Sequence, residues 1–169
     1  MTRRNPAVVL PLIIALACVA MLAGALLFQH VLGWEPCTLC VQIRLWLSLG
    51  AILAVLLSGA AALKQNWLGF ALWPLLLATS AMAVVDNAHV VLIEVGIMES
   101  FSCSPFPFYS SYLPLHEYLP SLFMSGGICG QNDYAILGIP FTAWTLISVV
   151  GLFLFTLYSL WRAIRSARS

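Results

Sequence analysis

Four long stretches without a charged residue constrain this sequence more than any other feature. A helix needs about 17–20 mostly apolar residues to cross a hydrocarbon core of about 30 Å. Each of the four stretches is at least that long, so each predicts one membrane-spanning helix. The stretches cover residues 5–34, 45–63, 65–85 and 134–161.

The composition supports lipid as the main solvent of the chain. Charged residues make up 8% of the sequence, whereas a soluble domain usually carries about 25%. The formal net charge is +1 and no run of like charges resembles a polyanion-binding patch, which argues against a nucleic-acid partner. We therefore expect an all-α membrane protein, a four-helix transmembrane bundle that forms a single domain over residues 1–169. The predicted spans lie near residues 8–28, 43–63, 67–87 and 140–160.

The basic residues orient these spans. Six of them fall on one side of the bundle, and basic flanks stay in the cytoplasm. Both termini are therefore predicted to be cytoplasmic, and two outer loops, at about 29–41 and 88–138, lie on the opposite side. Arg44 is the one basic residue that breaks the pattern. The six are Arg3, Arg4, Lys64, Arg162, Arg165 and Arg168.

Two segments have alternative interpretations. The first span could be a signal peptide, with small residues at 23–25 as a cleavage site, but its apolar run continues to Phe28 and favours an uncleaved anchor. In the second outer loop, residues 112–123 combine apolar bulk with few charges. This segment fits a short helix lying flat on the membrane surface, and equally a loop packed on the outer helix ends.

Four of the five cysteines fall in the predicted outer loops. Cys37 and Cys40 form a Cys-X-X-Cys motif, Cys103 and Cys129 follow in the second loop, and Cys18 lies in the first span. Thiols that face an oxidising compartment pair as disulfides, so this placement suggests two bridges. Two inert structural bridges are one alternative. A zinc site is another, although zinc favours closely spaced ligand pairs and 25 residues separate Cys103 from Cys129.

Three features favour a reactive sulfur at Cys40. The first is the motif itself, because Cys-X-X-Cys motifs often have a lowered thiol pKa. The motif follows Pro36 at the start of a predicted helix, and proline is common in the first helical turn. The positive end of the helix dipole favours a thiolate there. Arg44 lies four residues after Cys40 and so shares its helix face, where a cation stabilises a thiolate. The alternative for Arg44 is an anchor that reaches the membrane interface.

The electron acceptor is predicted from what the sequence lacks. It contains no Rossmann fingerprint, haem-attachment motif or P-loop, the usual signatures of soluble cofactors. A protein that lies almost entirely in lipid exchanges electrons most easily with a lipid-soluble carrier, and a quinone fits. Arg44 could hydrogen-bond its carbonyl oxygens. His89, near the outer end of the third span, could add another bond, or could be an ordinary interfacial histidine.

The order of these motifs resembles the bacterial disulfide bond formation protein B (DsbB) family over about residues 8–160. The matching features are Phe28-Gln29-His30-Val31, Pro36-Cys37-Thr38-Leu39-Cys40, Arg44, Cys103, Gly127-Ile128-Cys129, Leu137-Gly138, Pro140 and Trp144. Tyr134 departs from the family, since many relatives carry Trp there. The resemblance implies a four-helix bundle in the bacterial inner membrane, with its active cysteines facing the periplasm.

The resemblance also implies a reaction. A reduced thioredoxin-fold partner of the DsbA type attacks a Cys103–Cys129 bridge, with Cys103 as the attacked sulfur. Exchange with Cys37–Cys40, through a transient Cys37–Cys129 bond, would reoxidise that bridge. Cys40 would then pass the electrons to ubiquinone or menaquinone, with Arg44 polarising the quinone.

Two other classes of function are open on the sequence alone. The chain could be a non-enzymatic membrane scaffold whose outer loops are held by structural disulfides. It could also be a small transporter, because charged residues inside the membrane often mark ion pathways. Asp86, at the edge of the third span, is the only candidate for such a pathway.

Overall fold

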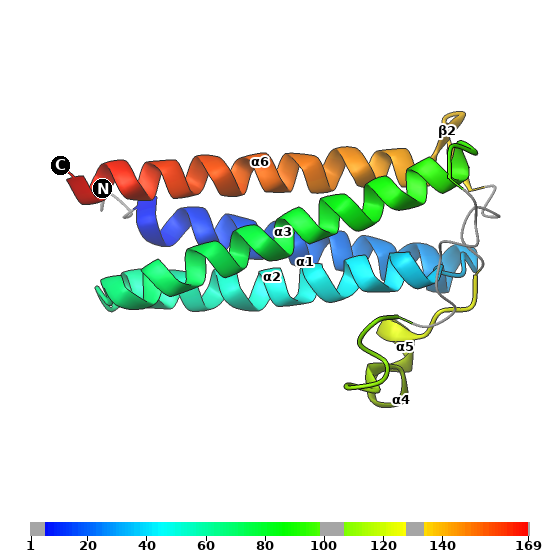
Figure 1. Cartoon of the computed structure of the whole chain (residues 1–169), viewed down its shortest axis with the longest axis horizontal. Helices are drawn as coiled ribbons and strands as arrows, with labels where there is room; N and C mark the ends of the chain where they lie inside the picture. The colour runs from blue at the N-terminus through cyan, green and yellow to red at the C-terminus, as the bar shows by residue number, and fades with distance from the viewer. Residues whose placement is uncertain (1–5, 99–106, 128–133, 169) are drawn as a thin grey trace.

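Four long helices run side by side along the length of the molecule (Figure 1). The computed structural model describes residues 6–98, 107–127 and 134–168. The start of the first long helix and the end of the last lie at the same end of the bundle. We call the opposite end, which carries the connections 33–37 and 95–140, the outer end. The long helices are α1 (Pro6–Leu32), α2 (Thr38–Ala62), α3 (Asn66–Glu94) and α6 (Phe141–Arg168).

Each long helix is long and apolar enough to cross a membrane, which confirms the predicted four-helix fold. In lipid, a helix satisfies all of its own backbone hydrogen bonds, so an apolar stretch has no cheaper conformation there. Pro11 and Pro74 lie inside α1 and α3. Each removes a backbone donor, a loss that neighbouring helices in a membrane can accommodate.

The helices extend past the predicted spans at the outer end. Helix α1 continues to Leu32, α2 already begins at Thr38, and α3 continues to Glu94. Parts of the outer loops predicted at 29–41 and 88–138 are therefore helical. The predicted spans had the length of about 20 residues that crosses the hydrocarbon core. A charged side chain limits the membrane-embedded length but does not end a helix.

Small and apolar side chains pack together at the centre of the bundle. Ile14, Cys18, Leu47 and Leu76 are almost fully buried there, so Cys18 is a packing residue. A Cβ added to Gly50 would lie 3.5 Å from Cys18 Sγ, which places α1 and α2 in close contact at this level.

Buried polar groups in the bundle are largely paired. Ser58 Oγ donates to the carbonyl of Val8, at 3.0 Å, and joins α2 to α1. Trp46 Nε1 donates to Asp86 Oδ2, at 2.7 Å, and joins α2 to α3. Asp86 therefore serves as a hydrogen-bond partner between two helices, which gives the transporter hypothesis no support.

The second connection packs against the outer part of α2. It contains the single-turn helices α4 (Leu115–Tyr118) and α5 (Pro120–Phe123), which lie beside the bundle in Figure 1. Phe123 and Tyr109 pack on Val41 of α2, whereas Tyr118 stays exposed. The second connection thus contains two short helices, and one of its faces packs on α2. A two-stranded antiparallel hairpin, β1 (Ala135–Ile136) and β2 (Ile139–Pro140), leads into α6.

Candidate functional site

The Cys-X-X-Cys motif forms the first turn of α2. Cys37 is the N-cap residue, with an extended backbone (φ −73°, ψ 169°), and its Sγ accepts a hydrogen bond from the backbone N of Cys40, at 3.3 Å. Serine, threonine or aspartate usually fills this position, because a side-chain acceptor satisfies a free N–H of the first turn. Both sulfurs are free thiols in this structure.

The two cysteines have different surroundings. Cys37 is 0% exposed, while Cys40 is partly exposed and lines a cavity. The pKa of the Cys37 thiol is raised well above its ordinary value, first by its hydrogen bond with the Cys40 side chain and then by burial. Cys37 is therefore held as a neutral thiol, and Cys40 is the sulfur that the cavity reaches.

The second connection docks on the segment just before this motif. The backbone N–H groups of Gly126 and Gly127 both donate to the carbonyl of Pro36, at 3.2 and 3.1 Å, and Gly127 pairs with Cys37 in a parallel bridge. A Cβ added to Gly126 would lie 2.8 Å from Glu35 Oε2, so the absence of a side chain permits this close approach. The chain leading to Cys129 is thus bound directly beside Cys37.

Arg44 is buried one turn below Cys40. Its side chain is only 5% exposed. Its Nη1 donates to Gln29 Oε1 of α1, at 2.6 Å, and to the carbonyl of Leu122 in α5, at 3.2 Å. Among the described residues both acceptors are neutral, so no carboxylate compensates the guanidinium. An interfacial anchor would be solvated; this cation is held inside the protein, against the same cavity as Cys40.

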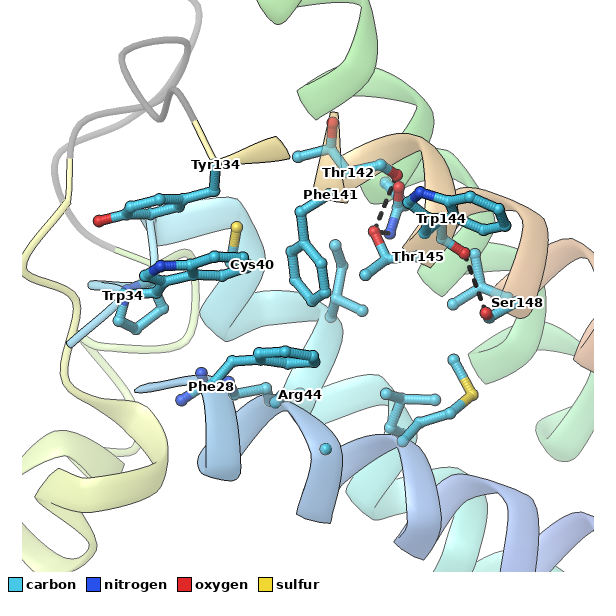
Figure 2. Close-up of a pocket in the computed structure, with 18 of the residues that line it drawn as sticks. Phe28, Trp34, Cys40, Arg44, Tyr134, Phe141, Thr142, Trp144, Thr145 and Ser148 are labelled. Carbon is cyan, nitrogen blue, oxygen red and sulfur yellow. Dashed lines mark hydrogen bonds between the residues drawn. The ribbon is translucent and has the colours of Figure 1, made fainter. Parts of the chain in front are cut away.

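A cavity of about 270 Å³ opens between the outer parts of α1, α2, α3 and α6. Figure 2 shows Arg44 and Phe28 on one side of it and Thr142 and Thr145 on the other. Its lining is mostly apolar, and ligand sites generally combine an apolar lining with a few placed polar groups. The cavity therefore has the character of a binding site for a largely apolar molecule.

One wall of the cavity is an aromatic stack, which we define as Phe28, Trp34 and Tyr134. The rings of Phe28 and Trp34 lie 5.2 Å apart, and those of Trp34 and Tyr134 lie 4.6 Å apart, with nearly parallel planes. Phe141 meets Phe28 edge-on at 5.0 Å. The Tyr134 hydroxyl accepts a hydrogen bond from the backbone N of Glu35. Such a wall offers a flat apolar surface to a ring-shaped ligand.

The opposite wall supplies polar groups from α3 and α6. Thr142 Oγ1 donates to the carboxylate of Glu94, and Asn87 Nδ2 donates to Thr145 Oγ1, at 2.9 Å. Asn87, Glu94, Thr142 and Thr145 all line the cavity. No sequence motif singled them out, although polar side chains inside membrane helices usually have a partner or a function.

Three of the predicted site residues lie together in the structure, and a fourth lies apart from them. Cys40 and Arg44 line one cavity, with Cys37 directly beside them. His89 is exposed on α3 and is not among the residues that line the cavity. Cys103 and Cys129 lie outside the described residues.

Comparison with known proteins gives one consistent family. Residues 7–159 match the family model described as disulfide bond formation protein DsbB. A protein of Methylococcus capsulatus named disulfide bond formation protein B is 33% identical over 153 residues, covering 89% of this chain and 92% of the relative. One of the same name from Shewanella denitrificans is 31% identical over 144 residues, covering 83% of this chain and 79% of the relative. Disulfide bond formation protein B 1 of Burkholderia lata is 33% identical over 148 residues, covering 86% and 84%.

Proposed function

The chain belongs to the disulfide bond formation protein DsbB family, and from this premise we propose that it is a dithiol:quinone oxidoreductase. It is a multi-pass membrane protein and a membrane disulfide oxidase of disulfide bond formation. Family membership does not favour the scaffold alternative. The proposed step is the reoxidation of a DsbA-like thioredoxin-fold partner, with a membrane quinone as the electron acceptor. One observation carries the quinone proposal: Cys40 and the buried cation Arg44 line the same apolar cavity.

The thiol exchanges use two disulfides of this chain. One thiolate of the reduced partner attacks Cys103 of a Cys103–Cys129 bridge and releases Cys129 as a thiolate. The second partner thiol then attacks the mixed disulfide, which leaves the partner oxidised and Cys103 reduced. Cys129 attacks Cys37 of an oxidised Cys37–Cys40 pair and releases the Cys40 thiolate. Thiol–disulfide exchange proceeds through such mixed disulfides.

A last exchange, in which Cys103 attacks, completes the series of thiol reactions. When Cys103 attacks the Cys37–Cys129 bond, the Cys103–Cys129 bridge forms again and Cys37 leaves as a thiol. The two electrons of the partner then reside on Cys37 and Cys40. The docking of Gly126 and Gly127 on Pro36 supports this order, because it holds the chain before Cys129 beside Cys37.

The residues of the cavity fit a quinone. The aromatic stack matches a flat ring, and Arg44 supplies a guanidinium donor for a carbonyl oxygen. Asn87, on the facing wall, lines the same cavity. A bound quinone would accept two electrons and two protons while Cys37 and Cys40 return to a disulfide, and would leave as the hydroquinone. Ubiquinone and menaquinone both have such a ring.

Arg44 has two tasks in this proposal. Its positive charge stabilises the Cys40 thiolate one turn away, and its N–H groups orient the ring ligand. His89 stays a predicted ligand residue whose exposed position would limit it to the rim of the site. The proposed location is the bacterial inner membrane, with the outer end of the bundle in the periplasm, supported by the basic residues at the inner end.

The test is quinone reduction by the purified chain supplied with a reduced DsbA-like protein. We expect Cys40→Ser and Cys103→Ser to abolish turnover, because each removes one sulfur of the relay. Cys18→Ala is the matched control, since Cys18 is a core residue outside the relay, and it should retain turnover. Normal turnover by Cys40→Ser or Cys103→Ser would refute the proposed relay. A thiol-trapping gel across a reductant series tests the scaffold alternative, which expects bridges that resist mild reductant.

A further inference from the structure

The side chain of Asn87 has one buried hydrogen-bonding atom without a partner among the described residues. Asn87 is only 2% exposed, and it lines the cavity. Its Nδ2 is bonded to Thr145, but its buried Oδ1 has no partner among the described residues. A buried polar atom without a partner typically costs about 1–3 kcal/mol, so an unused acceptor here calls for a functional explanation.

The orientation of the Asn87 amide is fixed by its neighbour. Thr145 Oγ1 donates its only hydrogen to the carbonyl of Thr142, at 2.8 Å, and can therefore only accept from Asn87. The NH₂ group of Asn87 consequently points at Thr145, and the carbonyl oxygen is the free end. The bond between Thr145 and Thr142 lies within the first turn of α6 and is visible beside the cavity in Figure 2.

The free oxygen is an acceptor, and the facing wall presents a donor. Arg44 carries N–H donors and no acceptor, which suits the carbonyl oxygens of an oxidised quinone ring. A quinone carbonyl cannot donate to Asn87 Oδ1. A hydroquinone can, because each of its ring oxygens carries a hydrogen. The two walls thus offer complementary groups to the two redox forms of the ring.

We propose that Asn87 Oδ1 accepts a hydrogen bond from a hydroxyl of the hydroquinone and makes the cavity bind the reduced ring more tightly than it otherwise would. This inference rests on the proposed quinone site. Thr145 acts as a positioning residue that holds the amide in the accepting orientation. The preference raises the reduction potential of the bound ring and so favours electron flow from Cys40 into the cavity.

The size of the effect follows from one neutral hydrogen bond. Such a bond gives about a fivefold preference in binding. For a two-electron couple, a fivefold change in the ratio of the two affinities shifts the potential by about 20 mV. The affinity of the oxidised ring should change by less than about twofold, because that form makes no bond to Asn87 Oδ1.

The experiment measures binding of the two redox forms to the full-length chain. A Cys40→Ser background prevents electron exchange with the protein, and a short-chain benzoquinone and its hydroquinone are titrated separately without oxygen. Quenching of tryptophan fluorescence reports binding, since Trp34 and Trp144 line the cavity. The variants are Asn87→Leu and Thr145→Val. Ser80→Ala on α3 is the matched control, because its Oγ donates to its own helix at Leu77 and it does not line this cavity.

We expect Asn87→Leu to weaken hydroquinone binding about fivefold and to leave quinone binding nearly unchanged. Thr145→Val should shift the same ratio in the same direction by less, which preserves the test if Asn87→Leu does not fold. Ser80→Ala should leave the ratio unchanged. Equal weakening of both forms, or an unchanged ratio in both variants, would overturn the inference while leaving the quinone site intact. If neither form bound the chain that retains Asn87, the quinone site and the inference would both be overturned.

Discussion

Replacing Arg44 by methionine should separate the stability of the outer end from ligand binding. Methionine has a similar length and no charge. The variant loses the two hydrogen bonds from Arg44 to Gln29 and Leu122, each worth about 1.5–3 kcal/mol when the donor is charged. It also removes a cation that is 5% exposed and lacks a carboxylate partner among the described residues. Burying an ion costs several kcal/mol.

These contributions are of similar size and opposite sign, so we expect the free energy of unfolding of Arg44→Met, without ligand, to change by only about 1 kcal/mol. The affinity for a quinone should fall much more. Loss of one hydrogen bond from a charged donor, about 1.5–3 kcal/mol, corresponds to roughly a 10- to 100-fold weaker affinity.

The assay combines chemical unfolding in detergent with quinone titration by tryptophan fluorescence. Gln29→Leu is the control, because it removes one acceptor of Arg44 and keeps the charge. It should retain quinone affinity to within a few-fold. A large loss of stability in Arg44→Met with unchanged quinone affinity would refute the reasoning, since Arg44 would then be a structural cross-link between α1, α2 and α5.

Predictions at three further residues concern packing and titration. A Cβ at Gly50 would meet Cys18 and Thr79 at ordinary distances, 3.5 and 3.8 Å, so thermal unfolding should show Gly50→Ala tolerated and Gly50→Leu destabilised by about 1–3 kcal/mol. The buried hydroxyl of Tyr109 has no partner among the described residues, so Tyr109→Phe should increase stability by about 1 kcal/mol in chemical unfolding. Burial raises the pKa of Tyr109 to about 12, above the value of about 10 for an exposed phenol. Stability therefore does not depend on the titration of this group below pH 10 and falls as the pH rises from 10 to 12, and ultraviolet absorbance should show this titration in the parent minus the Phe variant. The pKa of Cys37 is raised first by its hydrogen bond with the Cys40 side chain and then by burial. Cys40→Ser removes the first cause and keeps the burial, since Cys37 is 0% exposed. Iodoacetamide at pH 8 should therefore still label Cys37 in that variant much more slowly than free cysteine, and labelling as fast as free cysteine would contradict the burial.

The sequence predicted the fold well because a bilayer imposes a simple rule. An apolar stretch of about 20 residues can satisfy its backbone in lipid only as a helix, so the charge-free stretches revealed all four long helices. The helix ends were harder to predict. Arg44 and Glu94 interrupt the apolar pattern but lie inside or at the end of helices, and backbone hydrogen bonds continue past them.

The candidate site was only partly predictable. Cys40 and Arg44 are four residues apart on one helix, so their shared face follows from helix geometry. The aromatic stack brings together Phe28, Trp34 and Tyr134, and the last of these is 100 residues from Trp34. The pairing of Asn87 with Thr145 likewise joins two separate helices. Local spacing carries no information about such contacts, because they depend on how the helices pack.

One short segment of the second connection contacts both Arg44, which lines the cavity, and Pro36, just before the Cys-X-X-Cys motif. This link can be tested. The segment 122–127 is held at one end by Arg44, which donates to the carbonyl of Leu122, and at the other by Pro36, which accepts from Gly126 and Gly127. Loss of the first contact should loosen the second, because the segment is short and its ends move together. Arg44→Met should therefore increase hydrogen exchange at the amides of the two glycines, read by mass spectrometry of peptides that cover them. Ser58→Ala removes a comparable hydrogen bond at the inner end of α2 and should leave that exchange unchanged. Equal protection in both variants would mean that the loop docks without help from the cavity residues. Faster exchange in Arg44→Met alone would mean that the residue lining the cavity also secures the chain that leads to Cys129.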